Sequence, residues 1–178
     1  AKVLRVLQEM RFERLGGEAR AAVSALEPEI LVTFAYGRIF GPRFLALFPR
    51  GGLNVHPSLL PRWRGAAPIP NAILHRDAET GVSVQALAPE LDSGDLYAVE
   101  RFPLGGDETT EGLSEKAAAI GADLLSRVLS DIEAGRAKAR PQEGEVSFCG
   151  HFRKEDGLID WAASSLDIDA RIRALQPW

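Results

Sequence analysis

The segment LNVHPSLLPRWRGAAPI, residues 53–69, joins a strand-like apolar run to a polar loop stiffened by prolines. Side chains two residues apart on a strand point to the same face, so Asn54 and His56 are predicted to lie side by side. We expect residues 58–60 to be an exposed apolar segment. It can form a wall for a flat ligand or pack on the core, and the sequence leaves both open.

Outward from this segment, helices and strands alternate along the chain. The run EILVTFAY, residues 29–36, is continuously apolar and is typical of a strand buried on both faces of a parallel sheet. Further strands are predicted at 52–57, 81–87 and 96–102, and helices at 1–9, 16–27, 41–48 and 66–76. The turn at 89–95 joins the last two strands into an antiparallel hairpin.

The clearest periodicity lies between Thr109 and Gly135, where apolar residues recur at helical spacing. Thr109 or Thr110 is expected to cap this helix, and Gly135 to end it. Residues 138–161 have the composition of a linker or extended arm, and residues 163–178 of an amphipathic helix that stops at Pro177. The pattern predicts an α/β fold with a mixed sheet, parallel strands plus an antiparallel hairpin, flanked by helices.

Composition narrows the function classes. The net charge of −4 gives no general basic character for nucleic acid, although Arg62 and Arg64 remain candidates either for phosphate contact or for packing over the sheet. The single cysteine, Cys149, rules out an internal disulfide and makes a zinc site unexpected, so no metal is predicted. We expect a cytoplasmic protein, because no apolar run is long enough to cross a bilayer and the start does not read as a signal peptide.

Two polar features suggest a site, although each also has a purely structural interpretation. His56 can be a buried, hydrogen-bonded core histidine, and ELDSGD, residues 90–95, can be a simple turn. If the turn reaches the end of the strand, Asp92 contacts His56, raises the pKa of the imidazole and orients the ring. Asn54 then adds a neutral donor, as in an oxyanion hole.

This arrangement suits acyl transfer through a tetrahedral intermediate. Ser58 is not part of a nucleophile elbow and Cys149 lies far along the chain, so direct transfer between two bound substrates is expected. A phosphate-binding P-loop and a dinucleotide fingerprint are both missing from the sequence, which argues against nucleotide hydrolysis.

Five motifs carry a resemblance to a known family. They are AYG at 35–37, NVHPSLLPRWRGAAPI at 54–69, ETGVSV at 79–84, LDSGD at 91–95 and LIDWAASSLDIDARIRALQPW at 158–178. With them the chain resembles the formyltransferases that use 10-formyltetrahydrofolate, and most closely the branch that acts on methionyl-tRNA. The resemblance implies a Rossmann-like formyltransferase domain, a catalytic trio of Asn54, His56 and Asp92, and a folate site lined by Ser58, Leu59, Leu60 and Pro61.

The implied reaction transfers a formyl group from the co-substrate 10-formyltetrahydrofolate to the α-amine of initiator methionyl-tRNA, in a monomeric enzyme without a metal. Two alternatives remain open. The acceptor amine can belong to a sugar nucleotide or to glycinamide ribonucleotide, or the chain can be a folate-binding fragment without turnover.

The family pattern also implies a division of the chain. Residues 1–150 are expected to be the catalytic domain without its first strands, and residues 151–178 a linker and helix leading to a C-terminal β-barrel domain that the sequence lacks. The chain is therefore expected to be truncated at both ends, and its activity alone is left open.

Overall fold

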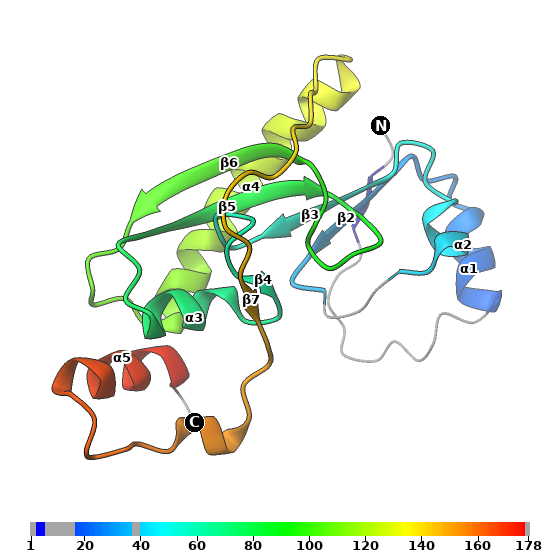
Figure 1. Ribbon diagram of the computed structural model, residues 1–178. Helices are drawn as coiled ribbons and strands as arrows, with labels where there is room; N and C mark the ends of the chain where they lie inside the picture. The colour runs from blue at the N-terminus through cyan, green and yellow to red at the C-terminus, as the bar shows by residue number, and fades with distance from the viewer. Residues whose placement is uncertain (1–2, 6–16, 37–39, 177–178) are drawn as a thin grey trace.

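A five-stranded mixed sheet forms the centre of the molecule. The computed structural model describes residues 3–5, 17–36 and 40–176. The strand order is β1-β2-β3-β5-β6, with β1 to β3 parallel and β5 and β6 antiparallel (Figure 1). The strands are β1 Val3–Arg5, β2 Ile30–Phe34, β3 Gly52–His56, β5 Glu79–Ala86 and β6 Leu96–Pro103. The predicted mixed sheet and its hairpin are confirmed.

The predicted helices between residues 16 and 76 are confirmed, each somewhat shorter than expected. The helices are α1 Gly17–Ser24, α2 Pro42–Leu45, α3 Pro68–Leu74, α4 Thr110–Glu133 and α5 Ser165–Leu175. The helix expected at residues 1–9 is wrong, because Val3–Arg5 is a strand paired with β2. A three-residue pairing with a buried neighbour outweighs the weak helix propensity of so short a window. The rest of that window lies outside the described residues.

Helix α4 packs on the sheet and carries much of the core. Thr109 is its N-cap, and the Thr109 hydroxyl accepts a hydrogen bond from the Gly112 amide at 3.2 Å. Apolar side chains of α4 join those of β3 and β5 in one buried cluster. Gly121 lies so close to the sheet that a Cβ there would be 2.8 Å from Val55. The long helix predicted from sequence is confirmed, with Thr109 rather than Thr110 as its cap.

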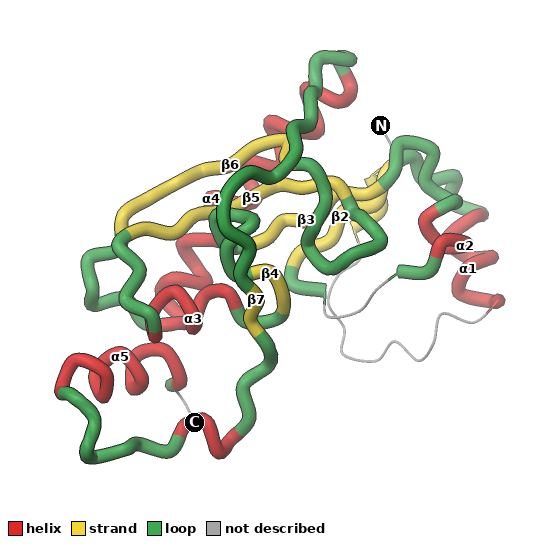
Figure 2. The backbone as a smooth tube through the Cα atoms, in the orientation of Figure 1, coloured by secondary structure: helices red, strands yellow, loops and turns green. Residues whose placement is uncertain are grey.

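After α4 the chain turns back as an extended arm, residues 138–161, which Figure 2 shows mostly as loop. The arm contains β7 Phe148–Cys149, which pairs in parallel with β4 Arg64–Gly65, and the 3-10 helix η1 Lys154–Gly157. Arg140 forms an antiparallel bridge with Leu96 at the start of β6. The arm predicted from composition is therefore confirmed, and backbone pairing attaches it to the rest of the fold at Arg140 and at β7.

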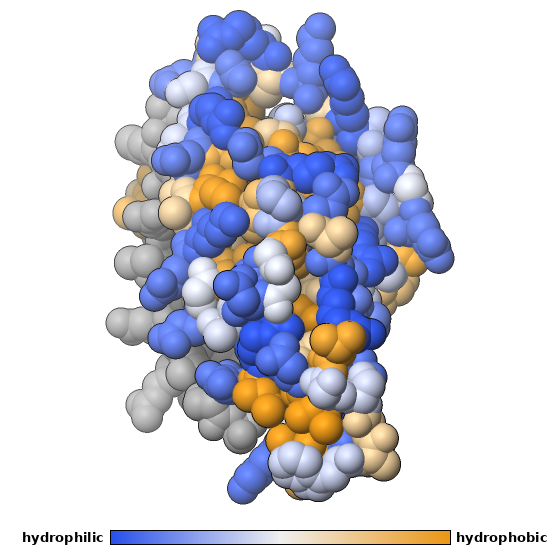
Figure 3. Space-filling model, turned by 90° about the vertical axis from the view of Figure 1, so that its left-hand side faces the viewer, coloured by the Kyte–Doolittle hydropathy of each residue, from blue (hydrophilic) through white to orange (hydrophobic). Residues whose placement is uncertain are grey.

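Helix α5 closes the fold against α3, at the lower end of the molecule in Figure 1. Ala174 and Leu175 belong to the same buried cluster as the sheet, while Leu166 and Ile172 are exposed. Figure 3 shows a face on which hydrophilic side chains predominate, with apolar side chains visible between them in the upper half and gathered again at the lower end. Pro177 lies outside the described residues, and the domain boundary at residue 150 stays a prediction.

Within residues 17–36 and 40–176, no helix combines the length and apolar character that crossing a bilayer needs.

Candidate active site

Three adjacent strands present a row of polar side chains on one face of the sheet. Thr33, Asn54 and Gln85 occupy matched register positions on β2, β3 and β5. The Thr33 hydroxyl donates to Oδ1 of Asn54 at 2.9 Å. The amide nitrogen of Asn54 is therefore turned away from Thr33 and toward Asp92. Thr33 and Gln85 are almost fully buried, so the row forms a fixed polar floor on this face of the sheet.

Asp92 lies over this floor. Its Oδ1 accepts hydrogen bonds from Nδ2 of Asn54 at 3.2 Å and from Nε2 of Gln85 at 2.9 Å. Its Oδ2 accepts one from the Gly65 backbone amide at 2.8 Å. Asp92 has a φ of +48°, a left-handed conformation that aspartate tolerates better than most residues. Three N–H donors thus hold the carboxylate in one orientation.

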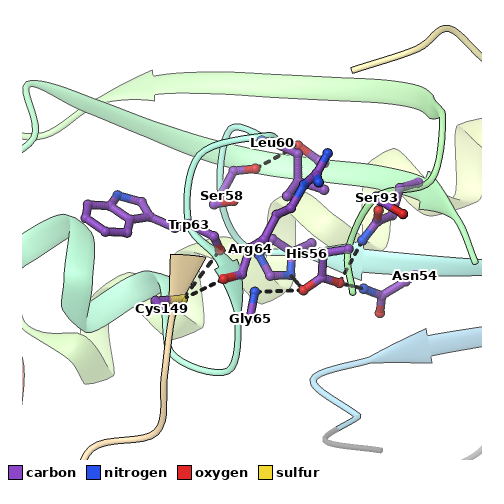
Figure 4. A network of polar contacts seen from close by, with 12 residues as sticks. Asn54, His56, Ser58, Leu60, Trp63, Arg64, Gly65, Ser93 and Cys149 are labelled. Atoms are coloured by element: carbon purple, nitrogen blue, oxygen red, sulfur yellow. Dashed lines mark hydrogen bonds and ion pairs between the residues drawn. The ribbon is translucent and has the colours of Figure 1, made fainter. Parts of the chain in front are cut away.

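His56 lies beside Asp92 and is only 4% exposed. Its Nε2 is 2.8 Å from the Trp63 carbonyl oxygen, and because that oxygen can only accept, Nε2 carries the proton. Nδ1 lies 3.7 Å from Oδ2 of Asp92, beyond direct hydrogen-bond distance. Asn54, His56 and Asp92, predicted to meet, are brought together, and Figure 4 shows Asn54 and His56 in this network.

The predicted direction of the His56 pKa is wrong. Burial lowers the pKa of His56 and outweighs the raising effects of Asp92 and of the Trp63 carbonyl oxygen. The imidazole is therefore neutral near pH 7, and the lone pair on Nδ1 is its proton acceptor. The sequence showed the neighbouring charge but not the depth of burial.

A close approach of β4 and β7 holds the Trp63 carbonyl and the Gly65 amide in place. Gly65 has a φ of +117°, and a Cβ there would lie 2.1 Å from the carbonyl oxygen of Cys149. The Cys149 sulfur lies 3.5 Å from the Trp63 carbonyl oxygen and 3.4 Å from that of Arg64 (Figure 4). Burial raises the pKa of the Cys149 thiol, so this cysteine stays protonated and packs as a structural residue.

An open pocket lies next to this network. It encloses about 550 Å³, including the part open to solvent. Its wall includes Thr33, Asn54, the aromatic rings of Tyr36 and Phe40, and every residue of the segment 85–92. The rings of Tyr36 and Phe40 stack with centroids 4.5 Å apart. A flat, partly apolar molecule with polar edges fits such a wall.

Residues 58–61 lie elsewhere. Ser58 is fully buried and donates its hydroxyl hydrogen bond to the Arg62 carbonyl oxygen at 2.6 Å. Leu60 is 6% exposed and its amide donates to the Ser83 hydroxyl at 3.2 Å. Of the two possibilities that the sequence left open, Ser58 and Leu60 follow the packed loop, because both are buried, while Leu59 is half-buried. None of Ser58, Leu59, Leu60 and Pro61 lines the pocket, and their assignment to a ligand site stays a prediction.

Both arginines of the loop have protein partners. Arg62 pairs with Asp77 and lies with its guanidinium carbon 4.6 Å from the centre of the Trp63 ring. Arg64 donates from Nε and Nη2 to Oε1 of Gln142, at 3.2 and 2.7 Å. Contacts within the protein therefore orient both side chains, and a phosphate contact by either arginine stays a prediction.

Sequence reasoning missed Thr33, Gln85 and Gln142. A polar residue inside each of two apolar strands was a signal for Thr33 and Gln85, although only the register shows that they adjoin Asn54. Gln142 had no local signal, because the arm must return from the far end of α4 to bring it here. Within the described residues, no three His, Cys, Asp or Glu side chains gather as a metal site.

Comparisons with known proteins agree with this geometry. Residues 5–129 match the family model described as formyl transferase. The chain is 51% identical over 158 residues to the methionyl-tRNA formyltransferase of Treponema pallidum, a match that covers 88% of this chain and 50% of that protein. It is 48% identical over 167 residues to the methionyl-tRNA formyltransferase of Treponema denticola, covering 93% and 52%. The chain thus spans about half the length of these curated relatives.

A structural neighbour supports the fold. The crystal structure of HypX from Aquifex aeolicus in complex with tetrahydrofolic acid matches with a TM-score of 0.78 at 19% sequence identity, covering 89% of this chain and 28% of that one. At this identity the likeness shows a shared fold.

Proposed function

Because the chain belongs to the formyl transferase family, we propose that it transfers a formyl group from 10-formyltetrahydrofolate to the α-amine of initiator methionyl-tRNA. The single observation that carries this is the Asn54, His56 and Asp92 cluster beside an open pocket. The identity to two methionyl-tRNA formyltransferases supports the acceptor, and the tetrahydrofolic acid in HypX supports the donor.

The folate is proposed to bind in the pocket formed by the segment 85–92 and the stacked rings of Tyr36 and Phe40. Aromatic and aliphatic walls favour a flat ring system, and the polar floor at Asn54 supplies donors near the reacting end. Ser58 to Pro61 are proposed to contribute by holding the loop between His56 and Trp63, since their own contacts are internal.

The transfer is proposed to run through a tetrahedral intermediate. The acceptor nitrogen forms a bond to the formyl carbon, the carbonyl oxygen becomes an oxyanion, and the bond from carbon to the folate nitrogen then breaks. Nδ2 of Asn54 has one N–H directed to Asp92 and a second N–H for the oxyanion.

The proton released by the amine is proposed to go to the Asp92 and His56 pair. Asp92 is part of the pocket wall, and neutral His56 offers Nδ1 behind it. An imidazolium formed there gains the attraction of the carboxylate and of the Trp63 carbonyl oxygen. The proton is then transferred to the leaving folate nitrogen, so that Asp92 and His56 return to their starting protonation states.

The test incubates the 178-residue chain with 10-formyltetrahydrofolate and initiator methionyl-tRNA, and detects formylmethionine by mass. Asp92→Asn, which keeps the shape of the side chain, and His56→Ala should each lower turnover by at least about a hundredfold. Folded wild-type protein that binds the folate but makes no product would contradict the proposal. An aminated sugar nucleotide and glycinamide ribonucleotide, offered as competing acceptors, should not be formylated.

A further inference from the structure

The side chain of Gln142 is hydrogen-bonded to the segment that carries Asp92 and to Arg64, although Gln142 belongs to the arm after α4. Its Nε2 donates to the carbonyl oxygens of Asp92 and Gly94, both at 2.8 Å. Its Oε1 accepts two hydrogen bonds from the Arg64 guanidinium. One side-chain amide thus joins the loop that carries Asp92 to the loop that carries the Gly65 amide.

Arg64 fixes the orientation of this amide. An arginine guanidinium has donors and no acceptor, so Gln142 must turn its oxygen toward Arg64 and its nitrogen toward the Asp92 loop. Nε2 of Gln142 also lies 3.4 Å from Oε1 of Gln85. This contact favours Gln85 with its own Nε2 toward Asp92, where it donates at 2.9 Å. Both N–H groups of the Gln142 amide therefore go to the Asp92 and Gly94 carbonyl oxygens, and Gln85 donates separately to the Asp92 carboxylate.

The Asp92 loop needs such support. Asp92 has a left-handed φ, and a Cβ at Gly94 would be 1.8 Å from the Ala86 carbonyl oxygen, so the loop is tightly turned. The Asp92 and Gly94 carbonyl oxygens both point to the one Gln142 nitrogen. Without it, two acceptors lose their partner and the loop is free to relax.

We propose that Gln142, oriented by Arg64, is a positioning residue that holds the Asp92 carboxylate against the Gly65 amide, Asn54 and His56. The catalytic importance of this rests on the proposed function, whereas the positioning itself does not. A Gln142→Ala variant should therefore release Asp92 while the sheet and the arm stay folded.

Hydrogen exchange at three successive backbone amides tests the positioning without an activity assay. Arg64 and Ala66 donate their amides to Ser147 and Cys149 of the arm, at 2.9 and 3.1 Å, whereas Gly65 between them donates to Asp92 at 2.8 Å. In Gln142→Ala, NMR hydrogen exchange at Gly65 should be about tenfold faster, with the two flanking amides unchanged. Glu143→Gln, at the exposed neighbouring position, should exchange like wild type.

Two results would overturn the proposal. If all three amides exchange faster together, Gln142 only attaches the arm, and if none does, Asp92 is held without it. Arg64→Met should also speed Gly65 exchange, and the double variant should be no faster than Gln142→Ala alone. If the double variant instead shows the product of the two single increases in exchange rate, Arg64 does not act through Gln142, and its part in the proposal is wrong.

The kinetic measurement uses the full chain with both substrates. Gln142→Ala should lower kcat by about tenfold to a hundredfold and change KM for the folate much less, as expected when a reacting group is misplaced. An unchanged kcat with faster Gly65 exchange would overturn the catalytic part. If the wild type transfers no formyl group, the proposed function fails, and the exchange experiment still decides the positioning.

Discussion

At His56, burial and charge act in opposite directions on one side chain. The ring gives up nearly all contact with water and keeps a carboxylate at 3.7 Å, and its pKa is lowered. A neutral imidazole with a free Nδ1 suits a group that must take up a proton during a reaction cycle. The same property makes the folded state sensitive to acid.

The pH dependence of stability follows from the lowered pKa. Unfolded His56 titrates near its ordinary 6.5, and the folded pKa is lower, so below pH 6.5 the unfolded state binds more protons. The free energy of unfolding should therefore fall as the pH drops below 6.5, by up to about 1.4 kcal/mol per pH unit from this residue. Urea unfolding of wild type and His56→Gln from pH 7.5 to 5 checks this.

The test compares how the free energy of unfolding depends on pH in wild type and in His56→Gln. His56→Gln should have a flatter stability profile below pH 6.5 than wild type. Parallel profiles for wild type and His56→Gln would show that His56 is not the buried neutral base described above.

At the scale of elements, the two-residue pairing of β4 with β7 is small but closely fitted. The backbone of Gly65 approaches that of Cys149 so closely that no side chain fits between them. This contact orients the Trp63 carbonyl toward His56 and the Gly65 amide toward Asp92. A short pair of strands thus supports two of the polar contacts of the site.

Gly65→Ala should lower the free energy of unfolding by about 2 kcal/mol or more, because the new Cβ meets backbone and the φ is unfavourable for alanine. Gly150→Ala is the matched control, since a Cβ there has nothing within 4 Å. Its free energy should stay within about 0.5 kcal/mol of wild type. Equal urea midpoints for the two variants would contradict the close fit.

At the scale of the whole molecule, the sheet, α4 and α5 share one apolar core. Ile30 of β2, Val82 of β5, Leu124 of α4 and Leu175 of α5 all belong to it. Elements that share a core lose it together, so we expect one cooperative unfolding transition. The buried Trp63 and the exposed Trp161 lie at different parts of the chain and offer local probes.

A variant in which Trp161 and Trp178 are replaced by phenylalanine leaves Trp63 as the single tryptophan. Its fluorescence should report the loop next to the arm, and far-ultraviolet circular dichroism the helices. The two urea midpoints should coincide. A lower midpoint for Trp63 would mean that the arm and its loop melt before the sheet.

Local patterns predicted the elements well, because period and capping are written in neighbouring residues. The apolar run before Tyr36 became β2, and the spacing after Thr109 became α4. The meeting of Asn54, His56 and Asp92 was also predictable, since two lie on one strand face and the third in the next hairpin. The strand register, the depth at which each residue is buried and the return of the arm to the site could not be predicted, because they depend on distant parts of the chain.

The wrong predictions concern features that depend on distant parts of the chain. The strand at Val3–Arg5 exists through pairing with β2, which no local propensity shows. Ser58 and Leu60 are buried through contacts with a distant strand, such as the hydrogen bond from the Leu60 amide to Ser83. The lowered pKa of His56 depends on how completely the loop covers it.

Helix α4 sets a constraint on chain length that differs from any constraint on residue type. Its 24 residues carry the chain over about 36 Å before the arm turns back to place Gln142. The water-facing positions of α4 are free to vary, but one inserted residue turns everything after it by about 100° and lengthens the helix by about 1.5 Å. Natural variants of this chain should therefore differ in the composition of α4 far more often than in its number of residues.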